Sequence, residues 1–74
     1  MSKRKAERQL KRFLDWCNAN PQSTSQEWVK NFKRMGWTAM SDFGFWTGKN
    51  EDHQASKKFG FVLDNPGREF PKDL

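Results

Sequence analysis

The apolar side chains of this sequence are mostly aromatic rings, and this limits the kind of core that it can form. The chain has seven phenylalanines and four tryptophans, against four leucines, two valines and no isoleucine. Because so few aliphatic residues cannot fill a core, most rings must pack against one another inside the fold. The rings are nevertheless numerous for 74 residues. We therefore expect one or two on the surface, at a contact with a partner or in a homodimer.

Length and cysteine content point to one small domain, residues 1–74, held together by apolar packing alone. Cys17 is the only cysteine, so no internal disulfide can form, and no Cys/His spacing is typical of a zinc site. We expect no metal and no cofactor. No apolar run approaches the length of a membrane span, and the basic N-terminus lacks the apolar stretch of a secretory signal. A lone thiol without a signal predicts the cytoplasm.

The positive charge is concentrated at one end of the chain. Residues 1–12 contain six basic side chains and one acidic one, which equals the net charge of +5 of the whole chain. The remaining 62 residues contain eight of each sign. An acidic partner, either nucleic acid or an acidic protein surface, would therefore meet this first segment.

Two segments have the periodicity of amphipathic helices. Within residues 3–18 the apolar positions recur at helical spacing, and the basic side chains fall on the opposite face. The apolar positions are Ala6, Leu10, Phe13, Leu14 and Cys17. The basic ones are Arg4, Arg8, Lys11 and Arg12, while Trp16 lies on the border between the two faces.

A second helix is predicted to begin at Thr24, which has capping-box spacing to Glu27. Trp28, Val29, Phe32 and Met35 form its apolar stripe, and Gly36 is predicted to end it with positive φ. Only about five residues, including Pro21, connect the two helices. This short connection favours an antiparallel or steeply crossed helical hairpin.

Beyond Gly36 the apolar period changes to two, which is typical of strands. Residues 43–46 and 59–63 both contain the string Phe-Gly-Phe, and a polar stretch that contains His53 separates them. This pattern predicts a β-hairpin with a long tip, and residues 37–40 could add a third strand. A turn at residues 64–67 would return Phe70 to the core. The predicted fold is therefore α+β, with two N-terminal helices packed on a small antiparallel hairpin or three-stranded sheet.

The residues needed for catalysis are few, and we expect no enzymatic activity. The chain has one histidine, one cysteine and no tyrosine. His53 is expected in the solvated hairpin tip, where a general base would have no pocket. Cys17 lies on the buried stripe of the first helix, where it should act as a small apolar residue with a raised pKa.

Residues 57–64, Lys-Lys-Phe-Gly-Phe-Val-Leu-Asp, resemble the RNP1 string of RNA-recognition motifs. In that family the aromatic residues stack on bases across an open sheet, and the resemblance implies this role for Phe59 and Phe61 beside Lys57 and Lys58. Lys58 stands where the motif has glycine and Asp64 where it has an aromatic residue. The likeness covers eight residues and does not establish the family. The alternative is that Phe59 and Phe61 face the helices as core.

The leading functional hypothesis is nucleic-acid binding through Arg4, Arg8, Lys11 and Arg12, with Lys57 and Lys58 as secondary contacts. The alternative is a protein-interaction module, a small adaptor or inhibitor of the kind that phages and mobile elements encode. Trp16, Phe45, Phe59 and Phe61 are the candidate rings for base stacking or for partner contact. Rings exposed beside basic residues would favour nucleic acid. A bare aromatic patch away from the first helix would favour a protein, because interface centres are depleted of charge.

Overall fold

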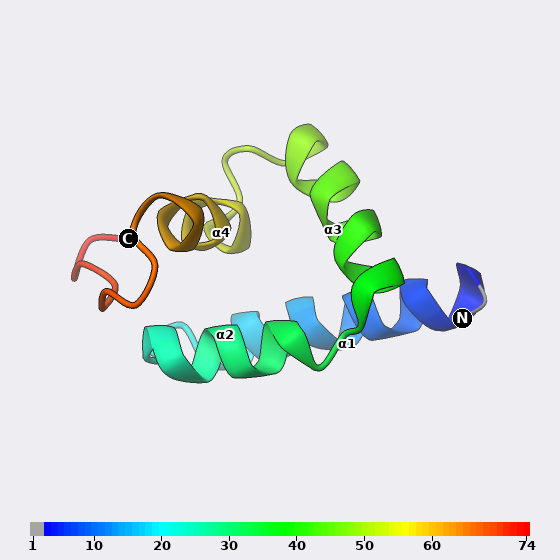
Figure 1. Ribbon diagram of the computed structural model, residues 1–74, viewed down its shortest axis with the longest axis horizontal. Coiled ribbons are helices and arrows are strands. Elements are labelled where there is room, and N and C mark those ends of the chain that lie inside the picture. The colour runs from blue at the N-terminus through cyan, green and yellow to red at the C-terminus, as the bar shows by residue number, and fades with distance from the viewer. Residues whose placement is uncertain (1–2) are drawn as a thin grey trace.

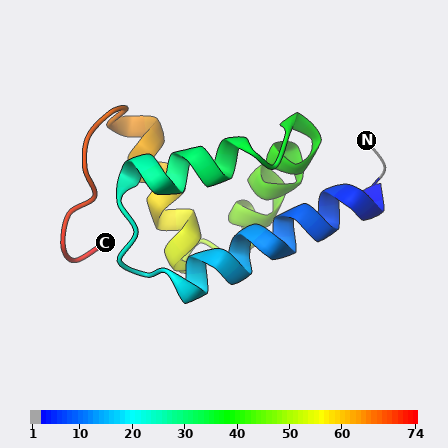
Figure 2. The same cartoon turned by 90° about the horizontal axis from the view of Figure 1, so that it is seen from below.

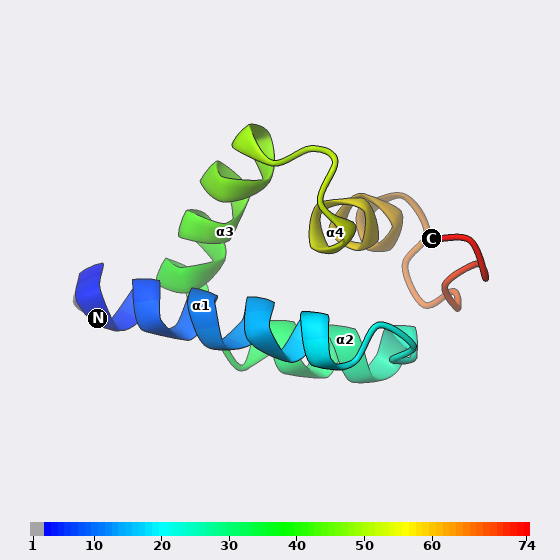
Figure 3. The same ribbon diagram turned by 180° about the vertical axis from the view of Figure 1, so that it is seen from behind.

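The computed structural model describes residues 3–74, which form four α-helices and no strand. The helices are α1 (Lys3–Ala19), α2 (Ser25–Lys33), α3 (Trp37–Lys49) and α4 (Gln54–Asp64). Helices α1 and α2 lie side by side in one layer (Figure 1). Helices α3 and α4 form a second layer on one face of it. The view from behind shows the same two layers (Figure 3).

The prediction for α1 is confirmed to within a residue at its C-terminal end. Ala6, Phe13 and Cys17 are buried, and Leu10 and Leu14 are partly buried against the same cluster. The regular 3.6-residue period of these apolar positions gives the helix a single face to bury.

The helical hairpin of α1 and α2 is also as predicted. The Thr24 Oγ1 accepts a hydrogen bond from the Glu27 N–H at 3.2 Å, which caps α2 at the expected residue. Trp28 is completely buried. Gly36 has the predicted positive φ, 84°, but it does not end α2, because the C-cap of α2 is Arg34 and Gly36 is the N-cap of α3. Seen from below, α1 and α2 run in opposite directions (Figure 2).

The predicted β-hairpin is wrong, and with it the α+β fold class. Residues 43–46 lie inside α3, residues 59–63 lie inside α4, and the proposed third strand at 37–40 is the first turn of α3. The Phe-Gly-Phe strings alternate over three residues only, which is too short a window to separate period two from period 3.6. Over a longer window, Ala39, Phe43 and Trp46 have helical spacing. Ala39 and Phe43 are fully buried, whereas Gly44, between Phe43 and Phe45, faces solvent.

The core is a cluster of rings, as the composition predicts. Phe13 is its centre, with ring centroids 5.2 Å from Trp28, 5.6 Å from Phe43 and 5.7 Å from Phe32, all edge to face. These rings come from α1, α2 and α3. Edge-to-face packing of this kind adds about 0.5–1.5 kcal/mol per pair beyond the area that it buries.

The C-terminal segment is fastened to the start of α2. Gly67 has a φ of 79° in a turn closed by the Arg68 N–H and the Asn65 carbonyl at 3.2 Å. As expected, Phe70 returns to the core and packs edge to face on Trp28 at 6.1 Å. A Glu69 carboxylate oxygen accepts the Ser25 N–H at 2.7 Å, which places a negative charge at the N-terminus of α2.

Candidate nucleic-acid interface

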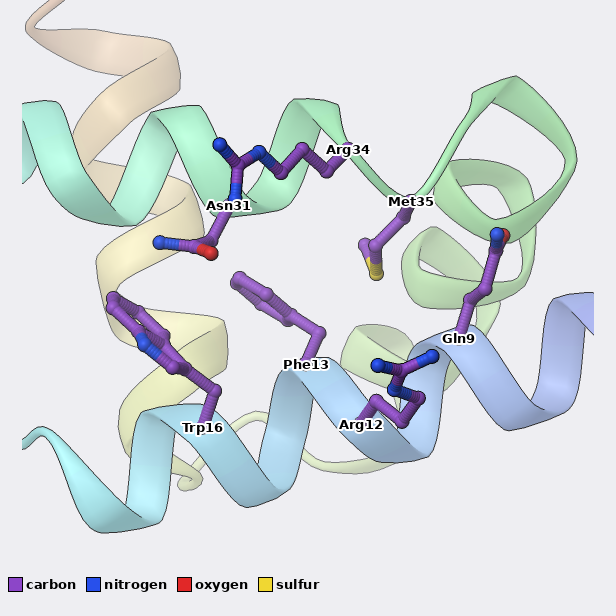
Figure 4. A pocket seen from close by; sticks show the side chains of 7 residues that line it. All are labelled: Gln9, Arg12, Phe13, Trp16, Asn31, Arg34 and Met35. Atoms are coloured by element: carbon purple, nitrogen blue, oxygen red, sulfur yellow. The ribbon is translucent and has the colours of Figure 1, made fainter.

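A groove of about 320 Å³ runs between α1 and α2. Figure 4 shows it with α3 and α4 behind the two helices, so the groove opens on the face of the layer that they do not cover. Its lining side chains are Gln9, Arg12, Phe13, Trp16, Asn31, Arg34 and Met35. The volume lies at the lower end of the range of about 300–1,000 Å³ that small-ligand sites occupy.

The antiparallel hairpin brings one strip of each helix to this groove. On α1 the lining residues follow at intervals of three or four, from Gln9 through Arg12 to Trp16. Asn31 on α2 and Arg34, the C-cap residue of α2, have the same spacing. Residues at this spacing share one helix face. Each strip borders the apolar stripe that its helix buries, so packing of the two stripes sets the two polar strips opposite each other.

Arg12 on α1 and Arg34, the C-cap residue of α2, give the groove its charge. Both side chains are exposed, and no carboxylate lines the groove. Within residues 3–74 neither guanidinium has a hydrogen-bonding or ion-pairing partner. Two like charges along one groove repel each other, and an anion bound between them would relieve that repulsion.

Trp16 forms an aromatic wall of the groove. It is half-buried and lies nearly parallel to Phe13, with an interplanar angle of 20° and centroids 6.2 Å apart. Phe13 itself packs against three further rings, so Trp16 is positioned by its contact with the centre of the core.

Charge differs sharply between the two halves of the chain. Residues 3–35, which contain α1 and α2, have nine basic and three acidic side chains, a net charge of +6. Residues 36–74 have five basic and six acidic side chains, a net charge of −1. An anionic partner is therefore attracted to the α1–α2 layer, where the groove opens.

The predicted basic face of α1 is in place, since Arg4, Arg8, Lys11 and Arg12 are all exposed. The structure brings Arg12 and Trp16 of the predicted set together in the groove. Sequence reasoning missed Arg34, Asn31 and Gln9. Helical projection of both segments, combined with the short connection between them, is the signal that could have placed Arg34 opposite Arg12.

Lys58 does not fit its predicted role as a phosphate contact. It is 2% exposed, and its Nζ donates a hydrogen bond to the Pro21 carbonyl at 3.1 Å and lies 5.3 Å from the centre of the Phe70 ring. Helix α1 has no basic residue in its own last turn, and Lys58 supplies a positive charge just beyond it. Lys57, in contrast, is exposed.

Phe59 and Phe61 do not form the shared platform that the RNP1 resemblance implies. Two residues apart on a helix, their side chains point in directions about 160° apart. Phe59 packs on Phe32 and Phe43, at 5.4 and 5.2 Å, while Phe61 packs on Phe70 at 5.7 Å. The alternative that both rings face the helices as core is confirmed for Phe59, which packs against the core cluster, but not for Phe61, which does not belong to it.

Phe45 lies on a separate surface, the outer face of α3, which consists of Trp37, Ser41, Gly44, Phe45 and Gly48. Trp37 is 78% exposed and Phe45 is 68% exposed, and the Lys49 Nζ lies 4.6 Å from the centre of the Phe45 ring. Lys49 is also exposed and borders this face through its contact with Phe45, so the face has one positive charge at its edge.

His53 and Cys17 have structural positions. The expected position of His53 in a solvated hairpin tip is wrong. His53 is the N-cap of α4, where its Nδ1 accepts the Ala55 N–H at 3.0 Å and its ring packs edge to face on Trp46. Burial raises the pKa of Cys17 to about 11, against smaller lowering effects of the Trp28 indole and the Lys58 charge. This confirms the expected direction.

Two further features concern metals and membranes. Residues 3–74 contain no group of three or more His, Cys, Asp or Glu side chains that could hold a metal ion. None of the four helices is both long and apolar enough to cross a membrane.

Comparison with known proteins gives no relative. No family model, no curated protein and no solved structure matches this chain.

Proposed function

We propose that this protein binds nucleic acid through the positive face of its α1–α2 layer. The observation that carries the proposal is the pair of unpartnered guanidinium groups, Arg12 and Arg34, in a groove beside the Trp16 ring. Arginine and aromatic side chains together are what phosphates and bases need.

Further basic side chains extend this positive surface on both sides of the groove. Arg4, Arg8 and Lys11 are exposed along α1. On the other flank of α2, a second hollow of about 410 Å³ is bordered by Lys30, Lys33 and Arg68. A backbone of phosphates could thus follow α1 and cross α2 with basic side chains along its path.

The proposal is tested by fluorescence anisotropy with labelled oligonucleotides at about 50 mM salt, where electrostatic binding is strong. The double variant Arg12→Gln/Arg34→Gln should bind at least about tenfold more weakly than the wild type, since each charge-assisted contact contributes about 1.5–3 kcal/mol. The control variant Lys49→Gln/Lys72→Gln removes the same charge from exposed positions outside the groove. If both variants weaken binding equally, net charge and not the groove is responsible. If the wild type does not bind below about 100 μM, the proposal fails.

A second candidate function, docking on a protein partner, is favoured by the outer face of α3. Trp37 and Phe45 are exposed on the half of the chain that has a net charge of −1, and Lys49 is the one exposed charged residue beside them on α3. Aromatic residues are enriched at interface centres. The partner would be a larger protein or a second copy of this chain.

Capture from nuclease-treated lysate, followed by mass spectrometry, tests the second candidate together with sedimentation of the isolated protein. Phe45→Ala should abolish a specific contact. Leu63→Ala is the matched control, because Leu63 on α4 is similarly exposed, at 65%. Equal capture by the wild type and by Phe45→Ala, with a monomer in sedimentation, would exclude this face as an interface.

A further inference from the structure

The groove offers a hydrogen-bond acceptor as well as positive charge. The Asn31 Nδ2 donates to the Glu27 carbonyl at 2.9 Å, which leaves the Asn31 Oδ1 without a donor among the described residues. The Gln9 Oε1 also accepts no hydrogen bond, but it is buried and closed to a ligand in this conformation. Phosphate groups carry no hydrogen-bond donor at neutral pH, so a phosphate alone would leave the Asn31 acceptor unmatched.

Base edges have the complementary chemistry. Adenine and cytosine present amino donors, and guanine, thymine and uracil present imino donors. Beside these donors lie acceptors that a guanidinium can bind. In a duplex the Watson–Crick edges are occupied by pairing, whereas in a single strand they are free. The Asn31 acceptor therefore favours an unpaired base over a duplex.

The shape of the groove favours the same ligand. It is bounded by two helices and the Trp16 ring, and its volume of about 320 Å³ is that of a small-ligand site. The half-buried Trp16 ring, which is backed by the buried Phe13, offers an apolar surface for stacking, which every base can use. A double helix could contact the outer arginines but could not insert a paired base between α1 and α2.

From these features we infer that the α1–α2 groove takes one unpaired nucleotide of a single-stranded nucleic acid, with the base beside Trp16 and the neighbouring phosphates on Arg12 and Arg34. This inference rests on the proposed function and adds the form of nucleic acid and the mode of binding. Asn31 would accept a hydrogen bond from the base. Exposed basic residues of α1 would bind phosphates further along the strand.

Three probes of equal length test the inference by fluorescence anisotropy: a single strand, the blunt duplex of the same sequence, and the single strand with a central run of abasic residues. The wild type should bind the single strand at least about tenfold more tightly than either other probe, because the abasic strand keeps the phosphates and loses the stacking. Equal affinity for all three would overturn the inference and leave nucleic-acid binding intact. Failure to bind any probe would overturn both.

Two variants assign the effect to the groove. Trp16→Leu keeps an apolar side chain against Phe13 and should lose about tenfold on the single strand, with no change on the duplex. Asn31→Ala should also weaken binding of the single strand alone, whereas Gln22→Ala, which is exposed between α1 and α2 and lines neither hollow, should not. Circular dichroism checks that each variant is folded. The abasic probe is measured with the wild type, so its result does not depend on the folding of a variant. If a folded Trp16→Leu and Asn31→Ala bind the single strand as the wild type does, the base does not occupy this groove.

Discussion

At the scale of single residues, two adjacent lysines on α4 have opposite environments. Lys57 is exposed, whereas the Nζ of Lys58 is enclosed between the Pro21 carbonyl and the Phe70 ring. The sequence could not separate them, because the groups that enclose Lys58 lie 37 residues before it and twelve residues after it. Burial of a lysine depends on such distant partners and not on its neighbours in the chain.

We expect Lys58→Met to lower the free energy of unfolding by about 1–3 kcal/mol. The substitution keeps most of the apolar stem but leaves the Pro21 carbonyl without its donor. Lys57→Met is the control and should change stability by less than about 0.5 kcal/mol. Urea unfolding of both variants makes the comparison. Equal midpoints and slopes would mean that water replaces the Lys58 ammonium at no cost.

Cys17 makes the stability depend on pH in the alkaline range. Burial raises the pKa of its thiol from 9.0 to about 11, so the folded state holds the proton more tightly than the unfolded state does. The resulting stabilisation is complete below pH 9 and is lost as the pH rises through 11. The difference in stability between the wild type and Cys17→Ala should therefore shrink over this interval.

Thiol-reactive dye at pH 7–8 should label Cys17 in the folded protein far more slowly than in the urea-unfolded protein. Fast labelling of the folded protein would contradict the buried position of Cys17.

At the scale of helices and strands, the sequence predicts the first half of the fold and misleads in the second. Helices α1 and α2 have long apolar stripes with basic opposite faces and a recognisable cap, so a single interpretation fits them. Helices α3 and α4 contain glycines between phenylalanines, which lowers helix propensity and imitates alternation. Their burial against the first two helices overrides that weak local preference. The core of rings was predictable from composition alone.

The glycines of α3 provide a direct test of its helical state. A Cβ added at Gly44 or Gly48 would meet nothing within 4 Å, and neither residue has positive φ. Gly44→Ala and Gly48→Ala should each stabilise the protein by about 0.5–1 kcal/mol, since alanine is the better helix former. Gly67→Ala should destabilise it, because φ at Gly67 is +79°. Thermal melts monitored at 222 nm give the three values, and destabilisation by Gly44→Ala would contradict the exposed helical position.

At the scale of the whole molecule, the candidate site joins two parts of the chain that the sequence presents separately. The basic face of α1 and the position of Trp16 at its border followed from the period of one helix. Arg34 and Asn31 could be assigned to the groove only once α1 and α2 were known to be antiparallel. The periodicity of one helix does not show which of its polar side chains face the other helix. The charges of the two halves can be counted in the sequence, but the fold determines that each half forms one layer.

This division of charge between the two layers predicts how binding will depend on salt. Four phosphate contacts along α1, from Arg4, Arg8, Lys11 and Arg12, imply a slope of log K against log salt of about −3 to −4 on duplex DNA, because each neutralised phosphate releases counterions. Arg8→Gln/Arg12→Gln should flatten that slope by about two units and weaken all sequences alike, since phosphate contacts do not read bases. The fold should be unaffected, because both side chains are exposed and neither belongs to the core cluster. Anisotropy titrations at several salt concentrations measure the slope. An unchanged slope in the double variant would place the phosphates elsewhere, and the second hollow with Lys30, Lys33 and Arg68 would then be the surface to vary.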